Sequence, residues 1–117
     1  MVAILILYVA CGLILVLVAI PLRYEKIPPN SWYGFRLPAT LSDPRIWYAV
    51  NKHSAARLIA AGVGTSLSAL AFFLIPGLTI DTYALACLAV CLVGLLIGLV
   101  QSVQYMRQLV RERDESE

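Results

Sequence analysis

Residues 2–22 read VAILILYVACGLILVLVAIPL and contain no charged side chain. Two further apolar stretches follow at residues 58–78 and 82–103. Each holds about 20 residues, which at a rise of about 1.5 Å per residue matches a hydrocarbon core of roughly 30 Å. None shows the polar stripe of a soluble amphipathic helix. The sequence therefore predicts an all-α membrane protein with three transmembrane helices, at residues 2–22, 58–78 and 82–106.

The composition supports lipid as the solvent for most of the chain. Of 117 residues, 61% are hydrophobic and 14% are charged, whereas soluble domains are about half apolar and a quarter charged. This length suits a single membrane domain without a separate soluble catalytic module. The net charge of +2 is small and no basic block alternates with aromatic residues, so no nucleic-acid partner is expected.

The first apolar stretch could instead be a cleaved targeting segment. It lacks a positively charged beginning, and no small-x-small cleavage site follows before Arg23. The sequence Val9-Ala10-Cys11 is similar to a lipoprotein cleavage box, but apolar residues continue well beyond Cys11. A membrane span is therefore the better interpretation.

Basic residues decide the predicted orientation. They gather between the first and second spans and after the third, whereas the turn between the second and third spans has none. Because basic loops stay on the cytoplasmic side, we expect the N-terminus to lie outside and the C-terminus to be cytoplasmic. The basic residues are Arg23, Lys26, Arg36, Arg45, Lys52 and Arg57, then Arg107, Arg111 and Arg113.

Small residues recur every four positions along the second and third spans, which lets helix backbones approach closely in lipid. A tight turn at Pro76-Gly77 makes these spans an antiparallel hairpin, so we expect the two stripes to face each other. A homodimer interface is the alternative. The stripes consist of Ala56, Ala60, Gly64 and Ser68, and of Gly94, Gly98 and Ser102.

The cysteines and the tail suggest no chemistry. Cys11, Cys87 and Cys91 lie in apolar runs without a CxxC pair, so neither a metal nor a cofactor is expected. Cys87 and Cys91 share a helix face, as small residues at a helix contact do. The tail at 107–117 is expected to be a fraying helix end without a docking role.

The polar segment at residues 23–57 differs from the rest of the chain. Three prolines in its first half, Pro28, Pro29 and Pro38, exclude a regular helix there. Ser42-Asp43-Pro44 is typical of a helix start and predicts an interfacial amphipathic helix over about 43–54 that leads into the second span. Its apolar face would hold Ile46, Trp47 and Val50, with Arg45, Asn51 and Lys52 more toward the polar side. An aromatic belt at headgroup depth would consist of Trp32, Tyr33, Trp47 and Tyr48.

A motif in this segment resembles the SdpI (SdpI/YfhL) family of small bacterial membrane proteins, whose founding member gives immunity to a secreted killing peptide. The resemblance implies a membrane protein of the bacteriocin-immunity type. That founding member is longer, with additional spans before the motif, so this chain resembles a minimal version. The matching residues are Pro29-Asn30, Tyr33-Gly34-Phe35-Arg36-Leu37-Pro38, Thr40-Leu41, Trp47 and Asn51.

Arg36 is the strongest candidate for a binding residue, because its planar guanidinium can hold a carboxylate or phosphate through two hydrogen bonds. The alternative is that Arg36 pairs with backbone carbonyls or Asp43 and locks the loop. The candidate site contains Asn30, Thr40 and Asn51 as neutral hydrogen-bonding groups, Trp47 as a stacking or covering ring, and Tyr33, Gly34 and Pro38 of the same motif.

An enzyme is not expected, because no nucleophile–base pair or carboxylate pair is visible and His53 is the single histidine. The leading hypothesis is a non-enzymatic binding protein that recognises a toxin peptide, a lipid headgroup or a membrane partner through the loop around Arg36. A small transporter or lipid-handling oligomer is the second hypothesis, although no span contains a charge. An accessory or regulatory subunit of a membrane complex is the third.

Overall fold

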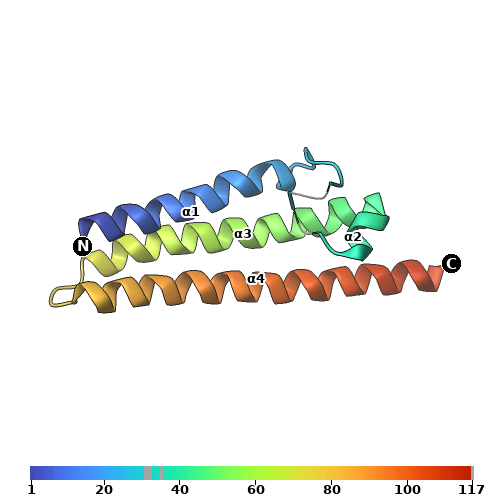
Figure 1. Ribbon diagram of the computed structural model, residues 1–117. Coiled ribbons are helices and arrows are strands. Elements are labelled where there is room, and N and C mark those ends of the chain that lie inside the picture. Colours follow the sequence, from blue (N-terminus) through green and yellow to red (C-terminus); the bar gives the residue numbers. More distant parts are fainter. Residues whose placement is uncertain (31–32, 35, 117) are drawn as a thin grey trace.

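The computed structural model describes residues 1–30, 33–34 and 36–116, and three long helices dominate it (Figure 1). The helices are α1 (Val2–Arg23), α2 (Pro38–Ser42), α3 (Pro44–Phe73) and α4 (Ile80–Ser116). Helices α1, α3 and α4 are each long and apolar enough to cross a membrane. The prediction of an all-α protein with three transmembrane helices is confirmed.

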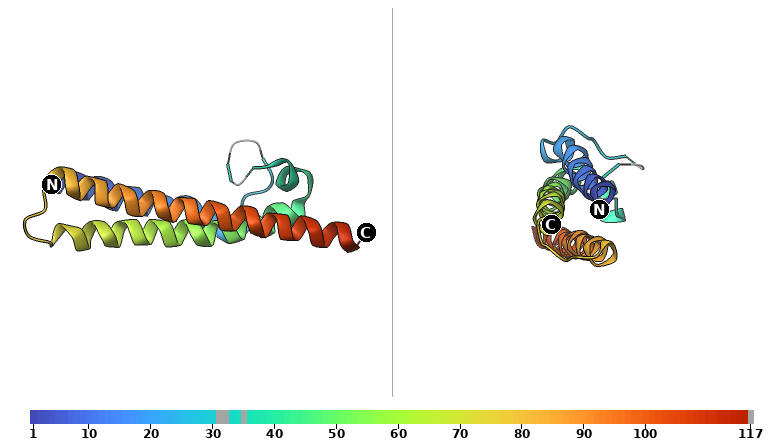
Figure 2. Two further views of the ribbon diagram at one scale, coloured as in Figure 1. Left: turned by 90° about the horizontal axis from the view of Figure 1, so that it is seen from below. Right: turned by 90° about the vertical axis from the view of Figure 1, so that its left-hand side faces the viewer.

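Helix α3 is the central element, with α1 and α4 packed along it (Figures 1 and 2). The N-terminus and the α3–α4 turn lie at one end of the bundle. The polar segment between α1 and α3 lies at the other end, as does the C-terminus. We call these the turn end and the motif end.

Two helix boundaries differ from the sequence-based expectation. Helix α3 begins at Pro44, where Asp43 caps it by accepting a hydrogen bond from the Arg45 N–H at 3.0 Å. It then continues without a break to Phe73, so the predicted interfacial segment 43–54 forms the first part of α3. The second span ends at Phe73 rather than at residue 78, because the chain already turns before Pro76-Gly77.

The contact between α1 and α3 depends on two glycines that the sequence analysis did not single out. A Cβ atom added at Gly12 would collide with Ser66 Oγ and the Gly62 carbonyl oxygen. A Cβ atom at Gly62 would lie 2.5 Å from the Gly12 carbonyl oxygen. Ser66 Oγ also donates a hydrogen bond to the Val9 carbonyl at 3.0 Å. Backbone therefore meets backbone here, as in other close helix crossings in lipid.

The predicted small-residue stripes meet only in part between α3 and α4. A Cβ atom at Gly94 would lie 3.3 Å from Ala61 Cβ, and one at Gly98 would lie 3.1 Å from Arg57 Cβ. A Cβ atom at Gly64 would meet nothing within 4 Å. The stripes thus flank a shallow space beside the helix contact, and the homodimer alternative remains a prediction.

At the turn end, a buried cluster of Ala69, Tyr83 and Cys87 joins α3 to α4. The Tyr83 hydroxyl donates to the Ala69 carbonyl at 2.7 Å, which satisfies its polar group within the apolar interior. Cys87 and Cys91 are both buried on one face of α4, in agreement with their predicted role as small residues at a helix contact.

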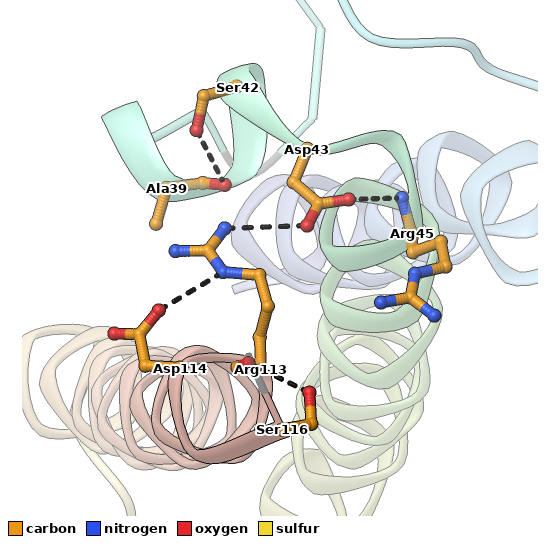
Figure 3. Close-up of polar contacts among 7 residues, drawn as sticks. All are labelled: Ala39, Ser42, Asp43, Arg45, Arg113, Asp114 and Ser116. Atoms are coloured by element: carbon orange, nitrogen blue, oxygen red, sulfur yellow. Dashed lines mark hydrogen bonds and ion pairs between the residues drawn. The ribbon is translucent and has the colours of Figure 1, made fainter.

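The tail does not fray as the sequence analysis expected. Helix α4 continues to Ser116, and Arg113 Nη1 lies 3.3 Å from Asp43 Oδ2 at the start of α3 (Figure 3). Arg113 Nε also lies 3.4 Å from Asp114 Oδ1. The far end of α4 is therefore fastened to the cap of α3.

This ion pair predicts an acid-sensitive contribution to stability. Partial burial alone would raise the pKa of Asp43, but the Arg45 N–H and the Arg113 guanidinium outweigh it and leave the pKa below its ordinary value of 3.8. Stabilisation from a lowered carboxylate pKa is present above the pKa of the unfolded state and is lost as the pH falls through the folded-state pKa. We therefore expect the Asp43 contribution to be complete at neutral pH and to vanish in acid.

The measurement is thermal unfolding in detergent from about pH 6 to about pH 2, comparing wild type with Asp43→Asn. The advantage of wild type should shrink steadily as the pH falls. Glu115→Gln, which removes an exposed tail carboxylate, is the matched control and should follow the wild-type curve. A constant difference between wild type and Asp43→Asn across this range would contradict the prediction.

Candidate functional site

The polar segment between α1 and α3 is organised around Trp47, which is fully buried in the first turns of α3. Its indole Nε1–H donates a hydrogen bond to the Ile27 carbonyl at 2.9 Å. Ile27 follows α1 by only a few residues, so this bond ties the exit of α1 to the start of α3. A buried indole needs such a polar partner, and here the partner also fixes the path of the loop.

Gly34 lies directly against the indole ring. A Cβ atom at this position would lie 3.1 Å from Trp47 Cη2 and 2.9 Å from Asn51 Oδ1. Gly34 also has a φ of +109°, a conformation that side-chain-bearing residues rarely adopt. The motif thus requires glycine here both for backbone conformation and for space.

Asn51 belongs to the interior of this arrangement, which corrects its predicted place toward the polar side of the helix. Its side chain is 2% exposed, and its Nδ2 donates to the Trp47 carbonyl at 2.9 Å. The prediction from helical periodicity was wrong because the loop folds back and covers the side of α3 that would otherwise face water. Ile46, Trp47 and Val50 are buried as predicted.

Thr40 and Pro38 shape the short helix α2. The fully buried Thr40 hydroxyl accepts a hydrogen bond from the Leu37 N–H at 2.9 Å and donates one to the Leu37 carbonyl at 2.8 Å. Pro38 occupies the first helical position, where its missing N–H has no cost. These two residues of the motif therefore turn the chain from the loop into α2.

Asn30 and Tyr33 fasten the beginning of the loop. Asn30 Oδ1 accepts from the Tyr33 N–H at 2.6 Å, and its Nδ2 donates to the Pro28 carbonyl at 2.8 Å. The Tyr33 hydroxyl donates to the Val18 carbonyl on α1. We call the set of Asn30, Tyr33, Gly34, Thr40, Trp47 and Asn51 the motif buckle, because it joins α1, α2 and α3.

Arg36 differs from these residues because its side chain is exposed. It lies two residues before α2. Asp43, the carboxylate considered as its partner, bonds to the Arg45 N–H and to Arg113. The structure thus divides the predicted site into the motif buckle, of which Thr40, Trp47 and Asn51 are buried, and the exposed Arg36.

The remaining predictions concern His53, a metal site and two aromatic residues of the loop. His53 stacks on Tyr105 of α4, with ring centroids 4.5 Å apart, so it contributes to helix packing. Within the described part of the chain, no group of three metal-ligating residues gathers. Trp32 of the predicted aromatic belt and Phe35 of the motif lie outside the described residues.

Sequence reasoning missed the partners that hold the buckle. The Ile27 and Val18 carbonyls are backbone groups and carry no side-chain signal. Arg113 was assigned to a solvated tail, although a basic residue near a helix end that returns to the motif side could have suggested a partner for Asp43.

Comparison with known proteins gives one match. The sequence model of the SdpI/YfhL protein family matches residues 26–102, which include the motif buckle, Arg36 and most of α3 and α4. No curated protein matches the chain, and no solved structure matches it.

Proposed function

Because the chain belongs to the SdpI/YfhL protein family, we propose that it is a non-enzymatic membrane protein of the immunity type that binds a membrane-active peptide through Arg36. The observation that carries this proposal is the contrast within the motif. Thr40, Trp47 and Asn51 are buried, whereas Arg36 is an exposed cation in the same motif.

The buckle gives Arg36 a defined setting. Gly34 is held against Trp47 two positions before Arg36, and Pro38 begins α2 two positions after it. A guanidinium on a restrained backbone loses less conformational freedom on binding than one on a flexible loop. It can then grip a carboxylate of a peptide through two charge-assisted hydrogen bonds.

The test compares cells that lack the protein with cells that make wild type, Arg36→Ala or Arg45→Ala, each challenged with a panel of membrane-active peptides. Loss of one charge-assisted contact weakens binding by about tenfold. We expect wild type to protect cells against at least one peptide. Cells that make Arg36→Ala should be killed by a dose of that peptide about tenfold lower than cells that make wild type.

Arg45→Ala is the matched control, because Arg45 is also an exposed arginine near the start of α3. It should protect as well as wild type. Native mass spectrometry of the gently extracted proteins should show the peptide on wild type and on Arg45→Ala only. Equal sensitivity of all strains to every peptide would refute the immunity role.

The same proposal includes an orientation, supported by the basic residues at the motif end. The N-terminus and the α3–α4 turn would be outside, and the motif buckle and C-terminus would be cytoplasmic. A fluorescent protein fused to the C-terminus should fold and fluoresce, whereas alkaline phosphatase fused there should be inactive. An active phosphatase at the C-terminus would reverse the orientation.

A further inference from the structure

Two hollows are lined by residues of both α3 and α4. One, of about 280 Å³, is lined by Ala60, Gly64 and Gln101 among others. The second, of about 350 Å³, is lined by Ala56 and Tyr105 among others. Ala56 precedes Ala60 by one turn of α3, and Gln101 precedes Tyr105 by one turn of α4, so both hollows open on the same side of the hairpin. We call them together the α3–α4 groove.

The half of the groove nearer the turn end is apolar and open. Gly94 and Gly64 line it, and a Cβ atom at Gly64 would meet nothing within 4 Å. In a bilayer such a space must be filled, and hydrocarbon is the medium around it. A flexible acyl chain can lie along this open hollow of about 280 Å³, and a second helix is the alternative occupant that the experiment below distinguishes.

The half nearer the motif end is basic. Arg23 and Lys52 line it together with one carboxylate, Glu25, and Arg57 lines the adjoining apolar half. Three cations and a single carboxylate therefore border the groove. A phosphate diester carries the complementary charge.

The position of Arg57 strengthens this reading. It precedes Phe73, the end of α3, by 16 residues, or about 24 Å of helix. That distance puts its backbone just inside a hydrocarbon core of roughly 30 Å. The described ion pairs involve Arg113 and not Arg57. A guanidinium at this depth must find a polar partner, and a headgroup phosphate is the group available there.

We propose that the α3–α4 groove binds one anionic phospholipid from the leaflet on the motif side. Its phosphate lies among Arg57, Lys52 and Arg23, and one acyl chain follows Ala60 and Gly64 along the apolar half. This site is separate from Arg36 and does not depend on the function proposed above.

The experiment is native mass spectrometry of the purified full chain in detergent, titrated with phosphatidylglycerol or with zwitterionic phosphatidylcholine. Wild type should hold one phosphatidylglycerol and prefer it to phosphatidylcholine. Arg57→Ala keeps the Cβ that contacts Gly98 and should weaken phosphatidylglycerol binding by about tenfold. Gly64→Leu grows into open space and should weaken it severalfold by blocking the chain.

Matched controls separate this site from other basic surfaces. Arg111→Ala removes an exposed charge from α4, and Arg36→Ala removes the motif charge; both should bind lipid as wild type does. Circular dichroism and thermal unfolding would establish that each variant is folded. Equal binding of the two lipids, or unchanged binding by both groove variants, would overturn the proposal. Dimers that disappear in Gly64→Leu would assign the groove to a second copy and overturn it as well.

Discussion

Replacing Trp47 with alanine is expected to lower the free energy of unfolding by about 3–5 kcal/mol, the usual cost of deleting a buried aromatic side chain. The indole is fully buried, supports Gly34 and donates to the Ile27 carbonyl. Its loss would leave a cavity at the point where the loop, α1 and α3 meet. Unfolding in mixed micelles, followed by far-UV circular dichroism, measures the difference.

Two further variants make this prediction sharper. Trp47→Phe keeps an aromatic ring but removes the hydrogen bond to Ile27, and should cost only about 1–2 kcal/mol. Tyr24→Ala removes an aromatic side chain that is 70% exposed and should change stability little. If Trp47→Ala were no less stable than Tyr24→Ala, the buckle would not be held by the indole.

The substitution Gly62→Ala adds one methyl group and is expected to destabilise the protein by about 1–3 kcal/mol, because overpacking at a close contact forces the backbone to move. The new Cβ would lie 2.5 Å from the Gly12 carbonyl oxygen, and 3.0 Å from Val16 Cγ2. A backbone carbonyl in a helix cannot turn aside, so α1 would have to shift away from α3. The same unfolding measurement reports the loss.

Gly64→Ala provides a matched control two residues away. It makes the same chemical change in the same helix, but its Cβ would meet no atom within 4 Å. Alanine is a better helix former than glycine by about 0.8–1 kcal/mol, so this variant should be neutral or slightly stabilising. Equal destabilisation by the two substitutions would show that the contact between Gly62 and α1 does not govern the effect.

The membrane spans and the start of α3 were predictable because each depends on local chemistry. Charge-free runs of bilayer length identify the spans, and a capping Asp43 before Pro44 identifies the helix start. The buried place of Asn51 was not predictable in the same way. It depends on a loop that folds back over α3. The helical periodicity of residues 43–54 does not indicate that a loop covers one side of the helix.

Close helix contacts show a related limit. Repeats of small residues pointed to α3 and α4, yet the tightest crossing joins Gly12 of α1 to Gly62 of α3. A single glycine in each helix forms no repeat, and only their juxtaposition in space reveals the contact. For the candidate site, most of the motif residues lie together in the structure, but the sequence could not separate the buried Thr40, Trp47 and Asn51 from the exposed Arg36.

Helix α3 is one continuous helix that contains both Trp47 of the motif buckle and Gly62 of the crossing with α1. Trp47 and Gly62 are 15 residues apart on one helix, which is about 22 Å of rigid rod. If α3 tilted by about 10° around its crossing with α1 at Gly62, Trp47 would move by roughly 4 Å at this length. Because α3 is continuous over this length, any such tilt would act on the hydrogen bond from Trp47 to the Ile27 carbonyl.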